Sequence, residues 1–136
     1  MTVYELDDDV SVAGQIRPED VPGLAARGIA MIVNNRPEGE EAGQPSGDEI
    51  EAAARAAGLQ YREIPIGGGI DPDQIVSLCA VLEDADGPML MYCRSGTRST
   101  YLWAFARRRQ GWESDEIIAR AGKAGYDLTA IRAMLR

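Results

Sequence analysis

Short apolar runs alternate with segments of helical character along this chain, and that alternation constrains the fold more than any other feature. Runs typical of buried strands cover Ile29–Val33, Gln60–Ile66 and Pro88–Tyr92. Helices are predicted between them, one from Ser46 to Ala57 and one from Asp71 to Asp84, each opened by a capping side chain. Strands that alternate with helices in this way form parallel sheets. The sequence therefore predicts an α/β fold, with a mainly parallel sheet flanked by helices.

Shorter elements are expected before and after this central part. Glycine and proline mark several of their ends, because Gly stops helices and Pro opens them. The expected elements are a leading hairpin of Val3–Leu6 and Val10–Val12, a helix over Pro18–Arg27, a helix over Thr100–Gln110, and two short closing helices capped by Ser114 and Asp127.

Length and charge narrow the class of protein. The 136 residues are enough for one domain, predicted over residues 1–136, and too few for two ordinary ones. The net charge of −8 argues against nucleic-acid and anionic-membrane partners, which need clustered positive charge. No run is long and apolar enough to span a bilayer, and the first residues lack the basic start of a signal peptide. We therefore expect a cytoplasmic protein.

The absence of histidine limits the chemistry. With 0 histidines the chain can form neither Ser-His-Asp triads nor His-ligated metal sites, and 2 cysteines are too few for a four-thiolate zinc site. We accordingly expect no metal and no other cofactor. Cys79 sits among apolar residues of a predicted helix, which leaves core packing or a resolving role open, whereas Cys93 follows an apolar strand.

The loop Cys93–Ser99, of sequence CRSGTRS, carries the strongest functional signal. A cysteine between a strand and a helix N-terminus lies at the positive end of the helix dipole, and consecutive N–H groups in such a turn form an anion-binding nest. Both effects favour the thiolate as a nucleophile. Arg98 can hold oxyanion oxygens with two hydrogen bonds, and Ser99 can donate one to the sulfur. The other residues expected to contact the anion are Arg94, Ser95, Gly96 and Thr97.

A second group of polar residues follows the first buried run. Asn34, Asn35 and Arg36 are expected beside the cysteine loop, because ligands of such folds lie at the carboxyl ends of the strands. Two interpretations stay open: these residues orient a substrate, or the asparagines shape the turn while Arg36 pairs with Glu38 or Glu40. The glutamates of this loop, otherwise expected to form a solvated rim, are Glu38, Glu40 and Glu41.

At these residues the chain resembles known families. The string CRSGTRS after an apolar strand resembles the active-site loop of rhodanese sulfurtransferases, whereas the order of strands and loops resembles the protein tyrosine and dual-specificity phosphatase superfamily. More closely, Val33–Pro37, Gln44–Ser46 and CRSGTRS resemble the phosphatase-like domain of bacterial β-lactamase-hydrolase-like proteins, some members of which are named sulfurtransferases. The resemblance covers roughly residues 3–130 and implies a protein tyrosine phosphatase-like fold with Cys93 as the nucleophile.

The cysteine loop departs from the phosphatase pattern in two ways. Four residues, Arg94–Thr97, separate Cys93 from Arg98, where the phosphatases of the superfamily have five. Tyr92 stands where they usually carry a histidine before the cysteine. A loop one residue shorter encloses a smaller cradle, as in rhodaneses, and suits a persulfide better than a full phosphoryl group.

The position of the general acid is a third departure. In the superfamily the general acid is an aspartate that follows the strand before the cysteine strand. In this chain Gly67–Gly69 occupies that position. Asp71 and Asp73 come a few residues later and could swing in on the glycine hinge. The other interpretation is that Asp71 only caps the next helix and Asp73 only favours its first turn.

Three functions stay open, in the following order. The first is sulfur transfer, in which Cys93 accepts a sulfane sulfur from thiosulfate or a persulfide and passes it on. The second is hydrolysis of a phosphate ester through a phospho-Cys93, with Arg98 on the phosphoryl oxygens and Asp71 or Asp73 as the acid. The third is a catalytically silent anion-binding or thiol-sensing module. A protein partner stays open in each case.

Overall fold

Five strands form one sheet in the computed structural model, which describes residues 1–136. The strand order is β1-β2-β5-β3-β4, and only the β1–β2 pair is antiparallel. The mainly parallel sheet is therefore confirmed. The strands are β1 (Val3–Glu5), β2 (Val10–Ala13), β3 (Met31–Asn34), β4 (Gln60–Glu63) and β5 (Met89–Tyr92).

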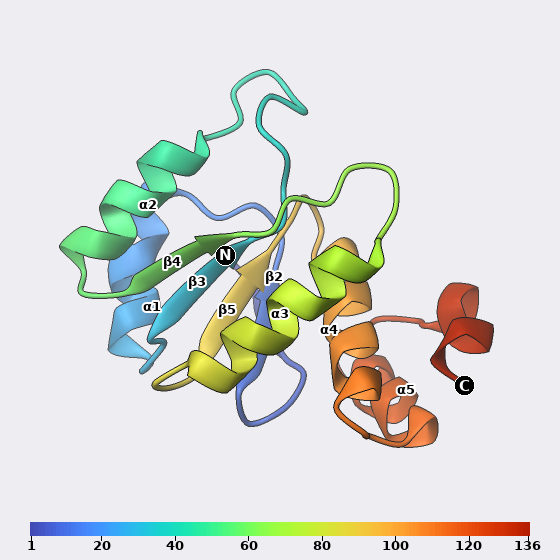
Figure 1. Ribbon diagram of the computed structural model, residues 1–136. Helices are drawn as coiled ribbons and strands as arrows, with labels where there is room; N and C mark the ends of the chain where they lie inside the picture. The colour runs from blue at the N-terminus through green and yellow to red at the C-terminus, as the bar shows by residue number, and fades with distance from the viewer.

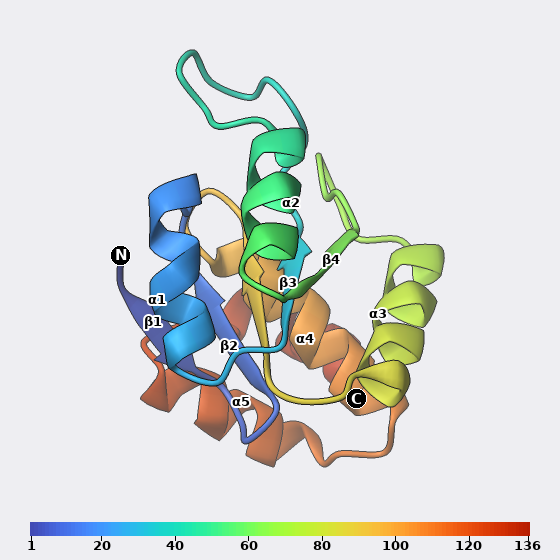
Figure 2. The same ribbon diagram turned by 90° about the vertical axis from the view of Figure 1, so that its left-hand side faces the viewer.

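Helices cover both faces of this sheet, as Figures 1 and 2 show. α1 and α2 pack on one face, and α3, α4 and α5 lie on the other. This placement is the one that parallel crossovers produce, because each connection returns across a face of the sheet. The helices are η1 (Pro18–Asp20, 3-10), α1 (Val21–Ala26), α2 (Gly47–Ala56), α3 (Pro72–Asp84), α4 (Thr97–Arg109), α5 (Ser114–Lys123) and η2 (Thr129–Leu135, 3-10).

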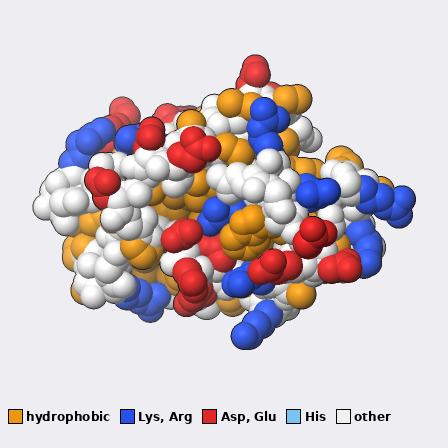
Figure 3. All heavy atoms as spheres, turned by 60° about the horizontal axis from the view of Figure 1, so that its bottom comes forward, with side chains coloured by type: hydrophobic (Ala, Val, Ile, Leu, Met, Phe, Trp, Pro, Cys, Tyr) orange, Lys and Arg blue, Asp and Glu red, His pale blue; other side chains and the backbone are white.

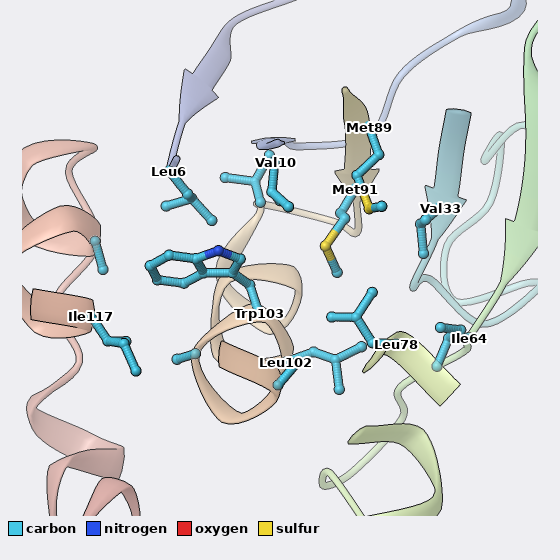
Figure 4. Packing of buried hydrophobic residues seen from close by; sticks show 14 of the residues in the cluster. Leu6, Val10, Val33, Ile64, Leu78, Met89, Met91, Leu102, Trp103 and Ile117 are labelled. Atoms are coloured by element: carbon cyan, nitrogen blue, oxygen red, sulfur yellow. The ribbon is translucent and has the colours of Figure 1, made fainter. Parts of the chain in front are cut away.

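Successive side chains of the central strand enter two different cores. Met89 and Met91 of β5 point to the face of α3, α4 and α5, whereas Leu90 and Tyr92 point to the face of α1 and α2. All four are buried, as expected of a strand covered on both sides. Trp103 of α4 lies near the centre of the first core (Figure 4).

A buried polar group ties this core to the start of β2. Asp7 accepts hydrogen bonds from Trp103 Nε1 at 2.7 Å and from Arg107 Nε at 3.0 Å, and its other oxygen accepts from the Val10 amide at 2.8 Å. Asp7 and Arg107 are both almost fully buried. Each charge is therefore paired and hydrogen-bonded, which offsets the cost of removing it from water. This network lies at the amino edge of the sheet, opposite the end where β5 meets the cysteine loop.

Some element boundaries differ from the sequence prediction. α4 begins at Thr97 instead of Thr100, so the second half of CRSGTRS belongs to the helix. The strand expected over Gln60–Ile66 is shorter, ending at Glu63. Ser114 does not cap α5: Glu113 is the N-cap residue, and the Ser114 hydroxyl instead donates to the carbonyl oxygen of Leu135.

The molecular surface carries both signs of charge. On the face seen in Figure 3, acidic and basic side chains are interspersed among apolar patches. None of the helices combines the length and the apolar character that crossing a bilayer would require.

Candidate active site

Cys93 lies directly after β5, at the carboxyl edge of the sheet. Its amide donates to the carbonyl oxygen of Ala13 at 3.4 Å, which continues the pairing of β5 with β2 by one residue. The backbone N–H of Gly96 donates to the Cys93 sulfur at 3.1 Å. Cys93 is completely buried. The sulfur therefore sits inside the turn that joins β5 to α4 and already accepts one of its N–H groups.

Gly96 is the N-cap residue of α4 and has a φ of +89°. Glycine adopts this conformation at low cost, and its own N–H points at the Cys93 sulfur. Because α4 follows at once, Cys93 lies at the positive end of a 13-residue helix. The prediction that the cysteine lies between a strand and a helix N-terminus is confirmed.

Arg98 lies in the first turn of α4 and bonds across to two other loops. Its Nη1 and Nη2 donate to the two carboxylate oxygens of Glu40 at 2.8 and 2.9 Å, and Nη1 also donates to the carbonyl oxygen of Ile66 at 2.6 Å. These contacts leave Nε–H and one Nη2–H, the side edge of the guanidinium, for a further acceptor. The pKa of Arg98 is raised, first by the hydrogen bond with Glu40 and further by the negative charge of a Cys93 thiolate.

Glu40 is shared between two arginines. Its Oε1 accepts from Arg36 Nε at 2.9 Å as well as from Arg98. The hydrogen bond with Arg98 is the largest cause that lowers the pKa of Glu40, which falls to about 2, and Arg36 adds to this effect. Glu40 is therefore ionised at any ordinary pH. Of the two interpretations of Arg36, its pairing with Glu40 is present in the structure.

Arg36 is only 3% exposed, and its remaining donors are unevenly used. Nη1 donates to Gln15 Oε1 at 3.0 Å, whereas Nη2 is buried without a hydrogen-bond acceptor. Gln15 in turn donates its backbone N–H to the carbonyl oxygen of Arg94, at 3.3 Å. Arg36 is thus linked to the cysteine loop through Gln15, and its Nη2 is a donor without an acceptor.

Asn34, Asn35 and Ser99 form buried hydrogen bonds that hold the loops together. Asn34 Nδ2 donates to the Tyr61 hydroxyl at 3.0 Å, and Asn35 Nδ2 donates to the carbonyl oxygen of Ile64 at 2.9 Å. The Ser99 hydroxyl donates to Asn35 Oδ1 at 2.8 Å. The predicted hydrogen bond from Ser99 to the sulfur is absent, because α4 begins early enough to turn Ser99 toward the loop after β3.

The two aspartates proposed as acids both lie at the start of α3 and are exposed. Asp71 is the N-cap residue: its side chain accepts from the Gln74 amide at 3.0 Å, and its own amide donates to Gln74 Oε1 at 2.8 Å. Asp73 lies in the first turn, where the helix dipole favours a carboxylate. Asp71 therefore caps α3, as the second interpretation of this residue predicts.

The other loop residues differ in exposure. Arg94 is exposed and forms an ion pair with Glu41 at 3.2 Å. Ser95 donates from its hydroxyl to Thr97 Oγ1 at 3.1 Å. Glu40 and Glu41 therefore contact the two arginines of the cysteine loop and are not merely a solvated rim. Nothing in the sequence pattern distinguishes them from Glu38, since these contacts join residues far apart in the chain.

Cys79 behaves as a core residue. Its side chain is buried in α3, and its thiol donates to the carbonyl oxygen of Ala106 at 3.6 Å. Burial is the main cause that raises its pKa.

No group of three or more acidic, cysteine or histidine side chains is arranged to hold a metal ion. A hollow of about 840 Å³ lies between β1 and α5 and does not include Cys93.

A family model matches most of the chain. Residues 3–109 match the model of the phosphatase-like domain of beta-lactamase hydrolase-like proteins. The chain belongs to this phosphatase-like domain family. A curated member, the beta-lactamase hydrolase-like protein of Xylella fastidiosa, is 35% identical over 130 residues. Those residues make up 94% of this chain and 30% of that protein, so the phosphatase-like domain spans about a third of its length.

Solved structures of phosphatases share the fold of this phosphatase-like domain. The crystal structure of a candidate phosphatase from Neisseria meningitidis is 34% identical and superposes with a TM-score of 0.88, covering 99% of this chain and 96% of that one. Tk-PTP in its active form shares the fold at 18% identity, with a TM-score of 0.73 and coverage of 98% and 92%. P. aeruginosa TpbA in complex with pTyr does so at 16% identity, with a TM-score of 0.63 and coverage of 98% and 89%. The expected protein tyrosine phosphatase-like fold is confirmed.

The comparisons also bear on the order of the three functions. The matched family and the N. meningitidis structure are both described in phosphatase terms, and none of these five matches is described as a sulfurtransferase. They favour phosphate-ester hydrolysis, which the sequence ranked second, over sulfur transfer, which it ranked first.

Proposed function

We propose that this domain hydrolyses phosphate monoesters, with Cys93 as the nucleophile. One observation carries the proposal: the Cys93 sulfur lies at the start of α4 and accepts the Gly96 N–H at 3.1 Å. A thiolate in this position is stabilised without a histidine base. The same N–H groups and the helix dipole favour an anionic phosphoryl group beside the sulfur.

The reaction has two displacement steps. In the first, the Cys93 thiolate attacks phosphorus, an S–P bond forms, and the P–O bond to the leaving alcohol breaks with its electron pair going to oxygen. In the second, water attacks phosphorus, the S–P bond breaks, and inorganic phosphate leaves while the thiolate is regenerated. Arg98 contributes the side edge of its guanidinium to the equatorial phosphoryl oxygens in both steps.

The leaving alkoxide needs a proton, for which Asp71 and Asp73 are the candidate donors. Asp71 immediately precedes α3 and Asp73 lies in its first turn, a few residues after the flexible run Gly67–Gly69. Asp71 is engaged as an N-cap, so Asp73 has the freer carboxylate. An aryloxide leaves without much assistance, whereas an alkoxide does not. Loss of the acid should therefore slow alkyl phosphates more than aryl phosphates.

Substrate entry requires the cysteine loop to open. Cys93 is fully buried, and the ion pairs of Arg94 with Glu41 and of Arg98 with Glu40 join its loop to the loop after β3. An incoming phosphate dianion would compete with Glu41 for Arg94, whereas Arg98 could donate to it from the side edge that Glu40 leaves free. Phosphotyrosine is a reasonable first substrate, because TpbA, which shares this fold, has been crystallised with it.

Sulfur transfer is the second candidate, and the short cysteine loop favours it. Only four residues, Arg94–Thr97, separate Cys93 from Arg98. In this reaction the Cys93 thiolate attacks the outer sulfur of thiosulfate, an S–S bond forms, and the bond to sulfite breaks with its electron pair leaving on sulfite. The persulfide then passes its outer sulfur to a thiol or cyanide. No proton donor is required.

Intact-protein mass spectrometry under non-reducing conditions separates these candidates. The purified domain would be exposed briefly to p-nitrophenyl phosphate, phosphotyrosine or thiosulfate, each beside a Cys93→Ser control. A Cys93-dependent phosphoryl adduct together with release of inorganic phosphate supports the proposal. A Cys93-dependent gain of one sulfur without phosphate release would replace it by sulfur transfer. Neither product, with phosphate still bound, would indicate the silent anion-binding module.

A further inference from the structure

Tyr126 follows α5 and lies outside residues 3–109, the part of the chain that matches the family model. Its hydroxyl donates a hydrogen bond to the carbonyl oxygen of Ser95 at 3.1 Å. We propose that Tyr126 is a positioning residue of the cysteine site, which fixes the Ser95–Gly96 peptide so that the Gly96 N–H points at the Cys93 sulfur. The inference rests on the proposed use of Cys93 as the nucleophile.

The two hydrogen bonds that carry this inference belong to one peptide unit. The Ser95 carbonyl oxygen accepts from Tyr126, and the Gly96 N–H on the other side of the same peptide bond donates to Cys93 Sγ at 3.1 Å. A trans peptide is planar, so its C=O and N–H point in opposite directions. Holding the carbonyl oxygen therefore sets the direction of the N–H. Tyr126 acts on the sulfur through this rigid unit without touching it.

Close packing against Gly96 restrains the same peptide. A Cβ atom built on Gly96 would overlap the Tyr126 hydroxyl oxygen and crowd the ring carbon that carries it. The φ of +89° favours glycine at this position, and any larger side chain would also have to displace the Tyr126 hydroxyl. The tyrosine leaves the loop little room to rotate the Gly96 N–H away from the sulfur.

Tyr126 is itself held in place. Its amide donates to the carbonyl oxygen of Ala121 at 2.8 Å, which joins it to the end of α5. Its ring meets that of Tyr4 from β1 edge to face, with the centroids 5.7 Å apart and the planes at 89°. A donor that is already restrained loses little freedom when it forms its hydrogen bond. Two elements distant from the cysteine loop in sequence therefore support its geometry.

The electrostatics keep Tyr126 a donor. Burial raises the pKa of its hydroxyl, and the negative charge of a Cys93 thiolate raises it further. Arg98 from α4, which pairs with Glu40, is a second ionisable side chain whose pKa is raised by the negative charge of a Cys93 thiolate. A raised pKa keeps the Tyr126 hydroxyl protonated, and therefore able to donate to Ser95, over a wider pH range.

The test compares Tyr126→Phe with the parent domain, both carrying Cys79→Ala so that Cys93 is the only thiol. Alkylation of Cys93 by iodoacetamide would be followed by mass spectrometry from pH 5 to pH 10. We expect the Tyr126→Phe rate at pH 6 to be roughly threefold to tenfold lower, because one hydrogen bond that orients a thiolate donor is lost. The two rates should converge as the pH rises, because the lost hydrogen bond affects the rate mainly by destabilising the thiolate.

Absorbance at 240 nm provides a second measurement that does not depend on access of the reagent to a buried sulfur. The matching Cys93→Ser proteins supply the baseline for tyrosine. The Tyr126→Phe thiolate should appear at a higher pH than the parent thiolate. Tyr4→Phe is the control, because it makes the same chemical change on the neighbouring ring and should leave both profiles unchanged.

Superimposable profiles for Tyr126→Phe and the parent, with both proteins folded by circular dichroism, would overturn the inference. A lower melting temperature without a change in the pH profile would assign Tyr126 a structural role only, which also overturns it. The test uses no substrate. A shifted profile in a domain that lacks phosphatase activity would therefore support this inference and contradict the proposed function. An unchanged profile in a domain with phosphatase activity would contradict this inference and leave the proposed function standing.

Discussion

The carboxylate of Glu40 accepts two hydrogen bonds from the guanidinium of Arg98, at 2.8 and 2.9 Å, across the gap between the loop after β3 and the first turn of α4. Both side chains are about a quarter exposed, at 27% and 24%. Arg36 holds the same carboxylate from its other side. The pair thus fixes one end of the Arg98 guanidinium and leaves its side edge, Nε–H and one Nη2–H, without a protein acceptor.

Glu40→Gln should remove a pH-dependent part of the stability. The pKa of Glu40 is lowered from 4.5 to about 2 by the hydrogen bond with Arg98, so its contribution is complete above pH 4.5 and is lost as the pH falls toward 2. At pH 7 we expect the free energy of unfolding to fall by about 1 kcal/mol, a value reduced by solvent screening. Urea unfolding at pH 7 and pH 2.5 would measure the difference, which should shrink at the lower pH.

Glu41→Gln is the matched control for this prediction. Its pair with Arg94 is longer, at 3.2 Å, and both side chains are more than half exposed. Such pairs contribute little to stability. A loss for Glu41→Gln equal to that for Glu40→Gln would contradict the special position of Glu40.

Arg98→Lys should impair the chemistry much more than Arg94→Lys. Lysine offers a single charge without the two-pronged edge that matches phosphoryl oxygens, and it cannot keep both hydrogen bonds to Glu40. We expect kcat/KM for p-nitrophenyl phosphate to fall roughly 100-fold for Arg98→Lys. Arg94 is exposed and pairs only with Glu41, so Arg94→Lys should stay within about threefold of the parent. Steady-state kinetics on both proteins decides the matter, and similar losses would argue against this role of Arg98.

Asp7→Asn should destabilise the fold without touching the cysteine site. Asp7 is buried between Trp103 and Arg107, so the substitution leaves a buried guanidinium without its buried counter-charge. The exposed Asp9, 3.3 Å from Arg107, is then the only remaining counter-charge of the buried guanidinium. We expect a loss of about 3 kcal/mol in the free energy of unfolding, measured by urea denaturation. Asp9→Asn is the control, because Asp9 is 71% exposed. Its cost should be below about 0.5 kcal/mol.

Ser99→Ala should act through the loops and not through the sulfur. The Ser99 hydroxyl donates to Asn35 Oδ1, and both residues are fully buried. Loss of the donor leaves that oxygen without its partner, which should cost about 1 to 2 kcal/mol of stability. Because Ser99 does not contact the sulfur, single-turnover formation of the phospho-enzyme at saturating substrate should fall by less than about tenfold. A larger loss, in a variant that stays folded, would restore Ser99 to the role that the sequence had indicated.

Local patterns in the sequence were enough to predict most of the fold. Continuous apolar runs such as Ile29–Val33 identified the buried strands, and Asp71-Pro72 marked the start of α3, because these signals depend on neighbours in the chain. The boundaries were less accurate where side chains compete for partners. Ser114, a good N-cap residue by type, bonds instead to the carbonyl oxygen of Leu135, a contact that the sequence pattern does not contain.

The position of Cys93 between a buried strand and a helix, with Gly96 and Arg98 in the same turn, could be predicted from the sequence, because this geometry depends on a few consecutive residues. The distant residues that complete the site could be identified only from the folded structure. Glu40 reaches Arg98 from the loop after β3, and Tyr126 reaches Ser95 from beyond α5. Both contacts form because the order of strands in the sheet and the packing of α5 bring these segments together. Contacts between residues so far apart in the chain cannot be read from sequence spacing.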